Sequence, residues 1–348
     1  MFIGTITRQI TSFPNMLLRR IKAVFYPVQY HGWGRSRRYF EGWYFKVVNA
    51  SEEKAFAFIP GIAMDEKGER HAFIQVLDGK KLTAGYHSFP AEAFCPAPGK
   101  FDLRIENNRF TEEYIRLDLP GIRGELRFSS RVEWPRRWYS PGIMGPYTFV
   151  PFMQCYHGIV SMDHALEGTL QIHGEEMSFS GGRGYAEKDW GHSFPSAYFW
   201  MQTNHFGTPG TSFKASVARI PWLGSSFTGF IAGIWHGGRL YRFTTYNGSV
   251  LKKSTAGLET VELIMENRNY RLEVLARRDH ATELASPLAG FMDGRISESM
   301  TSVIGVILTD KKSRTILLQD TGRNGALEVA GKIEEIISPL KGSCSACT

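Results

Sequence analysis

Beyond residue 38 the chain consists mostly of short segments in which apolar and polar residues alternate. Such alternation is typical of antiparallel strands that bury one face and expose the other. It is clearest at residues 122–128 (IRGELRF) and 270–276 (YRLEVLA). Clusters of Gly and Asn, which tolerate the positive φ of tight turns, separate these runs; they lie at Asn107-Asn108, His173-Gly174, Gly237-Gly238, Asn247-Gly248 and Asn267–Asn269. Because helical periodicity is almost absent after residue 30, we predict an all-β body.

A weak internal repeat indicates that this body contains two similar units. Short segments recur at a spacing of about 158 residues: Tyr39-Phe40 with Tyr198-Phe199, Phe73-Ile74 with Phe230-Ile231, Leu82 with Leu240, and Arg109-Phe110 with Asn269-Tyr270. We therefore predict a basic N-terminal helical segment (1–30), two lipocalin-like β domains (31–182 and 183–331) and a C-terminal tail (332–348). The Pro-rich stretch 134–151 and a hairpin at 165–179 are expected between the copies of the repeat.

The size and composition of each unit favour a small ligand-binding barrel. A sheet that closes on itself removes the exposed edges that would otherwise pair with other chains, and barrels of about eight strands hold one small ligand. Aromatic residues make up 13% of the chain, which indicates an apolar or ring-bearing guest. No run approaches the roughly 18 apolar residues of a membrane-spanning helix.

The charge of the chain is concentrated at its N-terminus. Met1–Phe40 contains no Asp or Glu, whereas seven of the 41 Lys and Arg residues lie there, and the rest of the chain is neutral. This distribution argues against a nucleic-acid groove, which needs basic residues spread over one face of the fold. The segment also lacks the uninterrupted apolar core of a signal peptide, so we expect a cytoplasmic protein.

Residues 14–26 are predicted to form a basic amphipathic helix. Its apolar residues fall on one arc, opposite Arg19, Arg20 and Lys22. Such a helix can lie on an anionic membrane surface. Docking of the same apolar arc on the body of the protein is an equally acceptable interpretation.

Several common chemistries are not signalled. The chain contains no H-E-x-x-H or G-x-S-x-G motif, no phosphate-binding loop and no dinucleotide fingerprint. The four cysteines do not form a disulfide framework. Cys344 and Cys347 form a lone C-x-x-C in a Gly/Ser-rich tail, which without two further ligands does not define a zinc site.

Two segments differ in composition from ordinary strands. One is Y-F-E-G-W-Y-F-K at residues 39–46, which sets Glu41 among aromatic rings, and the other is Y-A-E-K-D-W-G-H-S-F-P at residues 185–195. In an extended chain Glu187 and Asp189 point to the same face. Two carboxylates about 7 Å apart in an apolar wall repel, so one of them holds a proton near neutral pH and can act as a general acid. The alternative is a buried ion pair that joins Glu187 or Glu41 to Arg183 or Lys188.

These two segments, together with Y-F-W-M-Q-T-N at residues 198–204, resemble the signature segments of the tocopherol cyclase family. Weaker matches at Met153-Gln154, Gly237–Phe243 and Ala326–Val329 extend the resemblance over about residues 30–331. Through the similarity of that family to carotenoid 1,2-hydratases, the resemblance implies a tandem of lipocalin-like antiparallel β-barrels. Plant members have Asn at the position of Asp189, so the resemblance favours Glu187 and Glu41 as the essential acids.

The resemblance implies closure of a chromanol ring. An acid protonates the double bond of a prenylated hydroquinone, a tertiary carbocation develops, and the phenol oxygen attacks it in a dry pocket. The implied roles are general acid for Glu187, Glu41 and Asp189, orientation or deprotonation of the phenol for His192, and contacts with the cation or the ring oxygens for Trp43, Tyr44, Trp190, Trp200, Gln202 and Asn204. No metal, nucleotide or redox cofactor is implied, because substrate and product have the same oxidation state.

Two other functions remain compatible with the sequence. A lipocalin-like barrel can bind a prenyl quinone or lipid without converting it, since fold alone does not determine chemistry. A related acid-lined pocket could instead add water to a prenyl alkene. In each case the partner is a hydrophobic prenylated small molecule, drawn from a membrane that residues 14–26 would contact.

Overall fold

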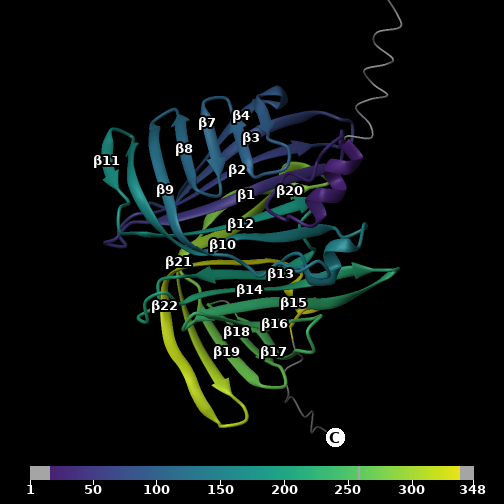
Figure 1. Cartoon of the computed structure of the whole chain (residues 1–348), viewed down its shortest axis with the longest axis vertical. Helices are drawn as coiled ribbons and strands as arrows, with labels where there is room; N and C mark the ends of the chain where they lie inside the picture. The colour runs from purple at the N-terminus through teal and green to yellow at the C-terminus, as the bar shows by residue number, and fades with distance from the viewer. Residues whose placement is uncertain (1–15, 258, 338–348) are drawn as a thin grey trace, which may run out of the picture.

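A computed structural model describes residues 16–257 and 259–337. Its body is built from two antiparallel sheets, one above the other in Figure 1. The first sheet has the strand order β4-β3-β2-β1-β12-β10-β9-β8-β7-β6-β5, and β11 pairs with β10. Its strands are β1 (Tyr39–Val48), β2 (Ala55–Met64), β3 (Arg70–Asp78), β4 (Thr83–Pro90), β5 (Phe94–Pro96), β6 (Asp102–Ile105), β7 (Asn108–Thr111), β8 (Tyr114–Leu119), β9 (Ile122–Val132), β10 (Cys155–Ile172), β11 (Glu175–Ser178) and β12 (Arg183–Gly191).

The second sheet repeats this order with fewer strands. It runs β16-β15-β14-β13-β22-β21-β19-β18-β17, and β20 pairs with β21. Its strands are β13 (Ala197–Thr203), β14 (Ser212–Trp222), β15 (Ser225–His236), β16 (Arg239–Thr244), β17 (Val250–Ala256), β18 (Thr260–Glu266), β19 (Tyr270–Arg277), β20 (Thr282–Leu288), β21 (Phe291–Asp310) and β22 (Thr315–Gly331). Short 3₁₀ segments are η1 (Ala91–Ala93), η2 (Gly145–Phe149) and η3 (Ile333–Glu335). The all-β, tandem lipocalin-like prediction is confirmed.

The internal repeat corresponds to equivalent strands in three of its four matches. Tyr39-Phe40 and Tyr198-Phe199 lie on β1 and β13, Phe73-Ile74 and Phe230-Ile231 lie on β3 and β15, and Leu82 and Leu240 lie at β4 and β16. The fourth match is wrong, because Phe110 lies on β7 whereas Tyr270 lies on β19. By its place beside the long strand β21, β19 corresponds to β9. The extra short strands of the first sheet shift the spacing there.

The boundary between the units differs from the predicted one. β12 starts at Arg183 but pairs with β1 and β10, so it completes the first sheet, and the hairpin at 165–179 also belongs there. The chain enters the second sheet at β13. At the C-terminal end, Ile333, Ile336 and Ile337 pack against the second core, while Cys344 and Cys347 lie outside the described residues.

Side-chain alternation along the central strands produces three apolar layers. Trp43, Phe45 and Val47 of β1 face the core of the first unit, and Phe199 and Met201 of β13 face the core of the second. The opposite faces of these strands meet at the seam between the two sheets, where a third cluster includes Tyr44, Tyr185, Tyr198, Trp200 and Met300. Positions two residues apart on one strand therefore share an environment, and neighbouring positions do not.

The N-terminal helix is present at residues 16–24 of the described chain, whereas the predicted start at residue 14 lies outside it. It packs through Ala23, which is buried, and Arg20, which hydrogen-bonds the carbonyl of Trp33. The predicted apolar arc instead faces solvent, since Leu17, Leu18 and Ile21 are each about half exposed. The interpretation that this arc docks on the body of the protein is wrong for these three residues. Among the described residues, no helix has the length and hydropathy needed to cross a bilayer.

Candidate active site

An apolar cavity lies at the seam, between the facing surfaces of the two sheets. Its volume is about 190 Å³, more than ten times the roughly 10–15 Å³ that one water molecule needs. Most of the lining is apolar and comes from both sheets, including Phe40, Ile59, Phe73, Trp200, Phe230 and Leu284. Four acidic side chains, Glu187, Asp189, Glu298 and Glu328, interrupt this lining. The cavity therefore lies between the two sheets rather than inside either barrel.

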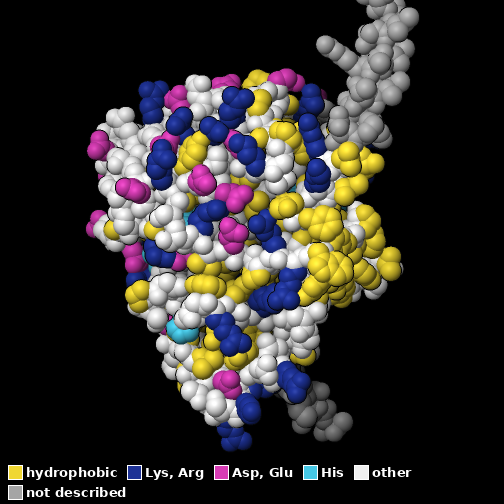
Figure 2. Space-filling view, in the orientation of Figure 1, with side chains coloured by type: hydrophobic (Ala, Val, Ile, Leu, Met, Phe, Trp, Pro, Cys, Tyr) yellow, Lys and Arg dark blue, Asp and Glu magenta, His cyan; other side chains and the backbone are white. Residues whose placement is uncertain are grey.

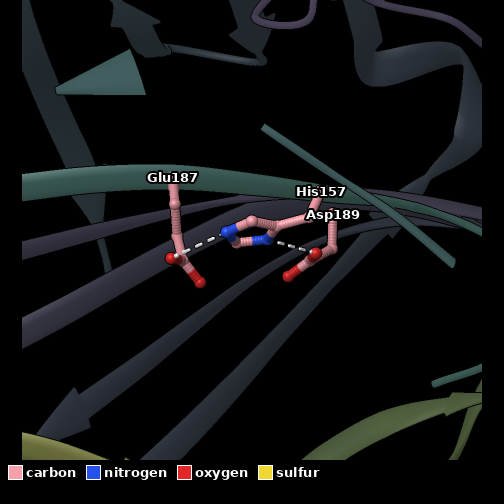
Figure 3. Close-up of side chains that lie close together, drawn as sticks. All are labelled: His157, Glu187 and Asp189. Carbon is pink, nitrogen blue, oxygen red and sulfur yellow. Dashed lines mark hydrogen bonds and ion pairs between the residues drawn. The ribbon is translucent and has the colours of Figure 1, made fainter. Parts of the chain in front are cut away.

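The first sheet contributes a histidine between two carboxylates. Asp189 of β12 lies opposite His157 of β10 in the strand register, and His157 Nδ1 lies 2.8 Å from Asp189 Oδ1. On its other side, His157 Nε2 lies 3.4 Å from Glu187 Oε2. Figure 3 shows the imidazole ring between the two acids. The three side chains form one connected polar group on the cavity wall.

Burial and the neighbouring charges set the protonation of this group. Burial and the ammonium of Lys214 lower the pKa of His157, but Glu187 and Asp189 outweigh them, so the net shift is upward. Burial raises the pKa of Glu187, and His157, Lys214 and the hydroxyl of Tyr185 together bring it below its ordinary value. Glu187 is thus ionised and His157 binds a proton readily. The expectation that Glu187 is the protonated member of a carboxyl pair is wrong, because charged and hydrogen-bonding partners stabilise its carboxylate.

The second sheet supplies a carboxyl pair that does hold a proton. Glu298 of β21 and Glu328 of β22 lie directly opposite one another in the register and both line the cavity. Burial raises the pKa of Glu298 to about 7. Burial and the charge of Glu298 raise the pKa of Glu328 well above its ordinary value. Two acids placed this close in an apolar wall cannot both ionise near neutral pH.

Two tyrosines, one from each sheet, hold this carboxyl pair in place. Tyr44 of the first sheet donates its hydroxyl hydrogen bond to Glu298 Oε1, and Tyr198 Oη donates to Glu328 Oε2 at 2.7 Å. Within residues 16–257 and 259–337, Glu298 Oε2 and the indole N–H of Trp200 are buried without a hydrogen-bond partner. Both residues line the cavity, so these polar atoms are available to a bound molecule.

Four of the sequence-predicted site residues line the cavity: Glu187, Asp189, Tyr44 and Trp200. All four lie at positions of β12, β1 and β13 that face the seam. Tyr44 and Trp200 also contact each other edge to face, with ring centroids 5.4 Å apart. The structure thus brings together four of the ten predicted residues.

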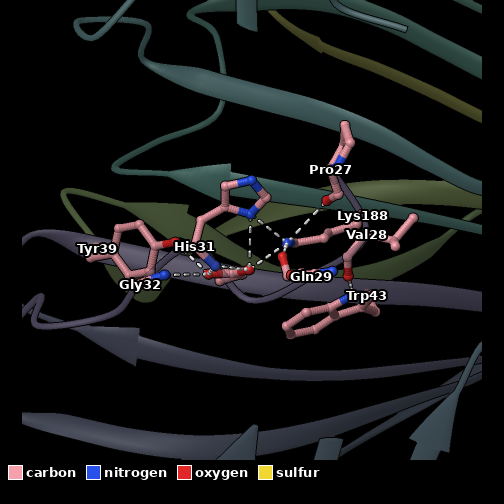
Figure 4. A network of polar contacts seen from close by, with 9 residues as sticks. Pro27, Val28, Gln29, His31, Gly32, Tyr39, Trp43 and Lys188 are labelled. Carbon is pink, nitrogen blue, oxygen red and sulfur yellow. Dashed lines mark hydrogen bonds and ion pairs between the residues drawn. The ribbon is translucent and has the colours of Figure 1, made fainter. Parts of the chain in front are cut away.

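Glu41 belongs instead to a buried ion pair inside the first unit. Its carboxylate contacts the Lys188 ammonium and accepts hydrogen bonds from the backbone N–H groups of His31 and Gly32 and from the hydroxyl of Tyr39. Burial raises the pKa of Glu41, but Lys188 and His31 bring it below its ordinary value. Figure 4 shows this network, which also joins Lys188 to the carbonyls of Pro27 and Gln29. Glu41 is ionised and absent from the cavity lining, so its assignment as a general acid is wrong and the ion-pair alternative holds.

The remaining predicted residues also lie away from the cavity lining. Trp43 stacks on Phe101 in the first core, and Trp190 stacks on His31 and Tyr156. His192 is partly exposed, at the end of the β12 segment. Two others serve the seam itself: Gln202 Oε1 accepts a hydrogen bond from Lys46 Nζ at 3.0 Å, and Asn204 Nδ2 donates to Asp163 Oδ1 at 2.9 Å. The prediction that Trp43 and Trp190 line the cavity is wrong because they lie on the opposite face of their strands. Each is one position away from a cavity residue, Tyr44 or Asp189.

The group formed by His157, Glu187 and Asp189 is also the one cluster within the described residues whose ligand atoms, all within 4.8 Å of one another, could hold a metal ion. The buried Lys214 acts on the same carboxylates, and its positive charge opposes a second cation. The donors are therefore adequate for a metal, but their electrostatic surroundings favour a proton.

Sequence reasoning missed His157, Glu298 and Glu328. Glu328 lies in the weak family match at Ala326–Val329, where it is flanked by apolar residues on both sides. That setting is a usable signal for a buried acid. His157 and Glu298 have no comparable signal, because their significance arises only from strand pairing.

The fold and site together define a class of protein: tandem lipocalin-like β units that enclose an acid-lined apolar cavity at their seam. Residues 120–331 match the family described as "Tocopherol cyclase-like". This match covers more than half of the chain, which therefore belongs to that family.

Curated relatives agree with this assignment. The chain is 23% identical over 374 residues to the Oryza sativa subsp. japonica protein named "Probable tocopherol cyclase, chloroplastic". It is 24% identical over 377 residues to a chloroplastic tocopherol cyclase of Zea mays. Each alignment covers 87% of this chain and 77% of the relative.

Solved structures support the fold. That of CghA has a TM-score of 0.55 at 13% identity and covers 85% of this chain and 89% of CghA. An AttH protein of Nitrosomonas europaea has a TM-score of 0.50 at 13% identity, covering 84% of this chain and 92% of the other. At these identities the likeness concerns architecture only.

Proposed function

We propose that the protein is a cyclase that closes a chromanol-type ring by adding a phenol oxygen to the double bond of a prenyl chain. The observation that carries this proposal is the protonated carboxyl pair Glu298–Glu328, which faces an apolar cavity opposite the basic group centred on His157. Membership of the tocopherol cyclase-like family supports the same reaction type.

The carboxyl pair is suited to the first step, protonation of an alkene. An isolated alkene is a weak base, so its protonation needs an acid that stays neutral at working pH and is shielded from water. With a pKa of about 7 for Glu298 and a raised pKa for Glu328, the pair retains a proton at neutral pH. The proton passes from the carboxyl to the less substituted alkene carbon, and the carboxylate left behind remains near the new charge.

Aromatic faces around the acid stabilise the tertiary carbocation. Tyr44, Tyr198 and Trp200 line the cavity beside the carboxyl pair. An aromatic face near a cation contributes about 0.5–2 kcal/mol, with the larger values in dry sites. The apolar lining also limits access of water, which would otherwise capture the cation and give an alcohol.

The group on the opposite wall is suited to the final proton transfer. Asp189 bonds His157 Nδ1, which leaves Nε2 as the nitrogen that accepts the phenol proton while the phenol oxygen forms the new C–O bond. Glu187 stabilises the resulting imidazolium. The proton returns to the carboxyl pair between turnovers, so atoms and charge balance without an oxidant or reductant.

Incubation of the purified protein with prenylated hydroquinones tests the proposal. A product of unchanged mass and altered retention time is expected. A gain of one water would indicate a hydratase instead, and binding without conversion would indicate a carrier.

Two variants assign the chemistry to the site. Glu328→Gln is expected to lose cyclisation while it still binds the substrate. Glu283→Gln, which removes an exposed carboxylate of the same unit, serves as the matched control and is expected to retain activity. Equal activity of both variants would remove the carboxyl pair from the mechanism.

A further inference from the structure

The N-terminal helix presents apolar residues to solvent on the side of the molecule where the cavity lining continues to the surface. Leu17, Leu18 and Ile21 are 52%, 54% and 51% exposed. The apolar arc of an amphipathic helix is usually buried against the body of the protein. Here that arc is uncovered, so burial in the body does not explain it. Figure 2 shows apolar side chains gathered on this side of the molecule.

Neighbouring loops extend this apolar area. Phe25 contacts Phe149 with ring centroids 5.7 Å apart, and Phe152 contacts Trp222 at 5.4 Å. We call this area the apolar surface; its exposed members are Leu17, Leu18, Ile21, Phe25, Tyr26, Trp138, Tyr139, Phe149, Phe152 and Leu223. Exposed apolar patches of this kind mark interaction sites.

The apolar surface is continuous with the cavity. Met144 and Tyr147 line the cavity and lie in the same segment as Phe149. Tyr147 also contacts Trp222, with centroids 5.7 Å apart. A hydrophobic molecule that leaves the cavity past Tyr147 therefore meets other apolar side chains before it meets water.

The charge around the apolar surface is entirely of one sign in the two segments that build most of it. Residues 16–40 and 134–162 contain no Asp or Glu, and the basic residues there include Arg19, Lys22, Arg136 and Arg137. Arg136 lies over the ring of Tyr26, 5.3 Å from its centroid, which places positive charge beside the exposed aromatics. Trp and Tyr rings flanked by Arg and Lys suit the interface of an anionic bilayer.

The helix is also attached to the cavity wall by a buried contact. Lys188, between Glu187 and Asp189 on β12, donates hydrogen bonds to the carbonyls of Pro27 and Gln29, just after the helix. Figure 4 shows Lys188 at these carbonyls, whereas Glu187 and Asp189, on the other face of the same strand, line the cavity.

We propose that the apolar surface docks on an anionic lipid bilayer, so that a hydrophobic substrate passes between the membrane and the cavity without crossing water. The docking step does not depend on the reaction proposed above. Its failure and the failure of the cyclase proposal are therefore separable, because vesicle binding is measured without turnover.

Flotation with vesicles of phosphatidylcholine alone, or of phosphatidylcholine and phosphatidylglycerol at about seven to three, tests the docking. The wild-type protein is expected to float with the anionic vesicles and less with the neutral ones. The Leu17→Ser/Leu18→Ser variant is expected to bind at least about tenfold more weakly, because two leucyl side chains no longer enter the interface. A matched Leu275→Ser/Ile316→Ser variant, which alters exposed apolar residues of the second sheet, is expected to bind like the wild type.

Three results would overturn the proposal: no binding of the wild-type protein to anionic vesicles, equal binding of both double variants, or a dimer that Leu17→Ser/Leu18→Ser dissociates. The last would show that a second copy covers the surface. Turnover adds a functional readout: Leu17→Ser/Leu18→Ser is expected to match the wild type with a short-tailed, dissolved substrate and to be slower when the substrate is supplied in anionic vesicles.

Discussion

Glu298→Gln is expected to lower activity. It is also expected to reduce the loss of stability that the protein undergoes as the pH rises to alkaline values. The folded protein raises the pKa of Glu298 from 4.5 to about 7, mainly because the carboxyl is buried. Below the unfolded pKa both states are protonated and the group contributes nothing. Between the two values ionisation favours unfolding, and above the folded pKa the penalty is complete.

The size of the effect follows from the shift. Each unit of pKa corresponds to about 1.4 kcal/mol, so the upward pKa shift that burial causes in Glu298 amounts to about 3 kcal/mol above neutral pH. Gln cannot ionise, and its loss of charge also relieves Glu328, whose pKa is raised in part by Glu298. The new amide leaves N–H groups in a site without partners, which costs about 1–3 kcal/mol. That cost does not depend on pH, so the slope of stability against pH is the diagnostic quantity.

The assay is urea unfolding of the wild type, Glu298→Gln and the exposed control Glu283→Gln at about pH 5 and about pH 8. The wild type and the control are expected to lose stability between these values, and Glu298→Gln is expected to lose about 3 kcal/mol less. If all three proteins show the same pH dependence, the buried carboxyl pair is not protonated in the folded state and the reasoning about the acid fails.

Two further predictions concern other residues of the cavity, and a third concerns the buried ion pair of Glu41. His157→Gln is expected to fold but to lose about 10²- to 10⁴-fold in turnover, while a chelator leaves the wild type unchanged; inactivation by the chelator would instead identify the cluster of His157 as a metal centre. Gly42→Leu is expected to weaken ligand binding in a calorimetric titration without unfolding the protein, because a Cβ at this cavity position meets no atom closer than 3.6 Å, and unchanged affinity would place the ligand elsewhere. Glu41→Gln is expected to lower the free energy of unfolding by about 3–5 kcal/mol, because it leaves the buried Lys188 without its charged partner, and the double change with Lys188→Met should recover part of that loss in thermal unfolding.

The all-β fold could be read from the sequence because its evidence is local. Four of the five predicted turns separate paired strands, for example Gly237-Gly238 between β15 and β16, whereas Asn247-Gly248 joins β16 to β17, which do not pair. Alternation at residues 122–128 and 270–276 correctly gave half-buried strands. The limits of each unit were harder to predict from the sequence. β12 directly precedes β13 in the chain, but it pairs with β1 and β10, which start at Tyr39 and Cys155. Strand partners of that sequence separation leave no local signal.

The candidate site was only partly accessible for the same reason. The sequence places Glu187 and Asp189 on one face of a strand, and this was correct, but a strand has two faces and the sequence does not say which unit each one meets. Glu41 was therefore assigned to the cavity although it lies with Lys188 in the interior of the first unit. His157 and Glu298 become significant through partners on other strands, Asp189 and Glu328.

The motif at residues 187–189 has a physical explanation once both faces of β12 are considered. Its two acids line the cavity at the seam, where His157 and Lys214 stabilise Glu187 as a carboxylate. The lysine between them points the other way, neutralises Glu41 and binds the segment that carries the N-terminal helix. A change of Lys188 would therefore alter the N-terminal helix and the placement of the cavity acids together. β12 thus connects the His157 group in the cavity to the surface through which we expect the substrate to enter. The proposed proton donor comes instead from β21 and β22 of the other unit.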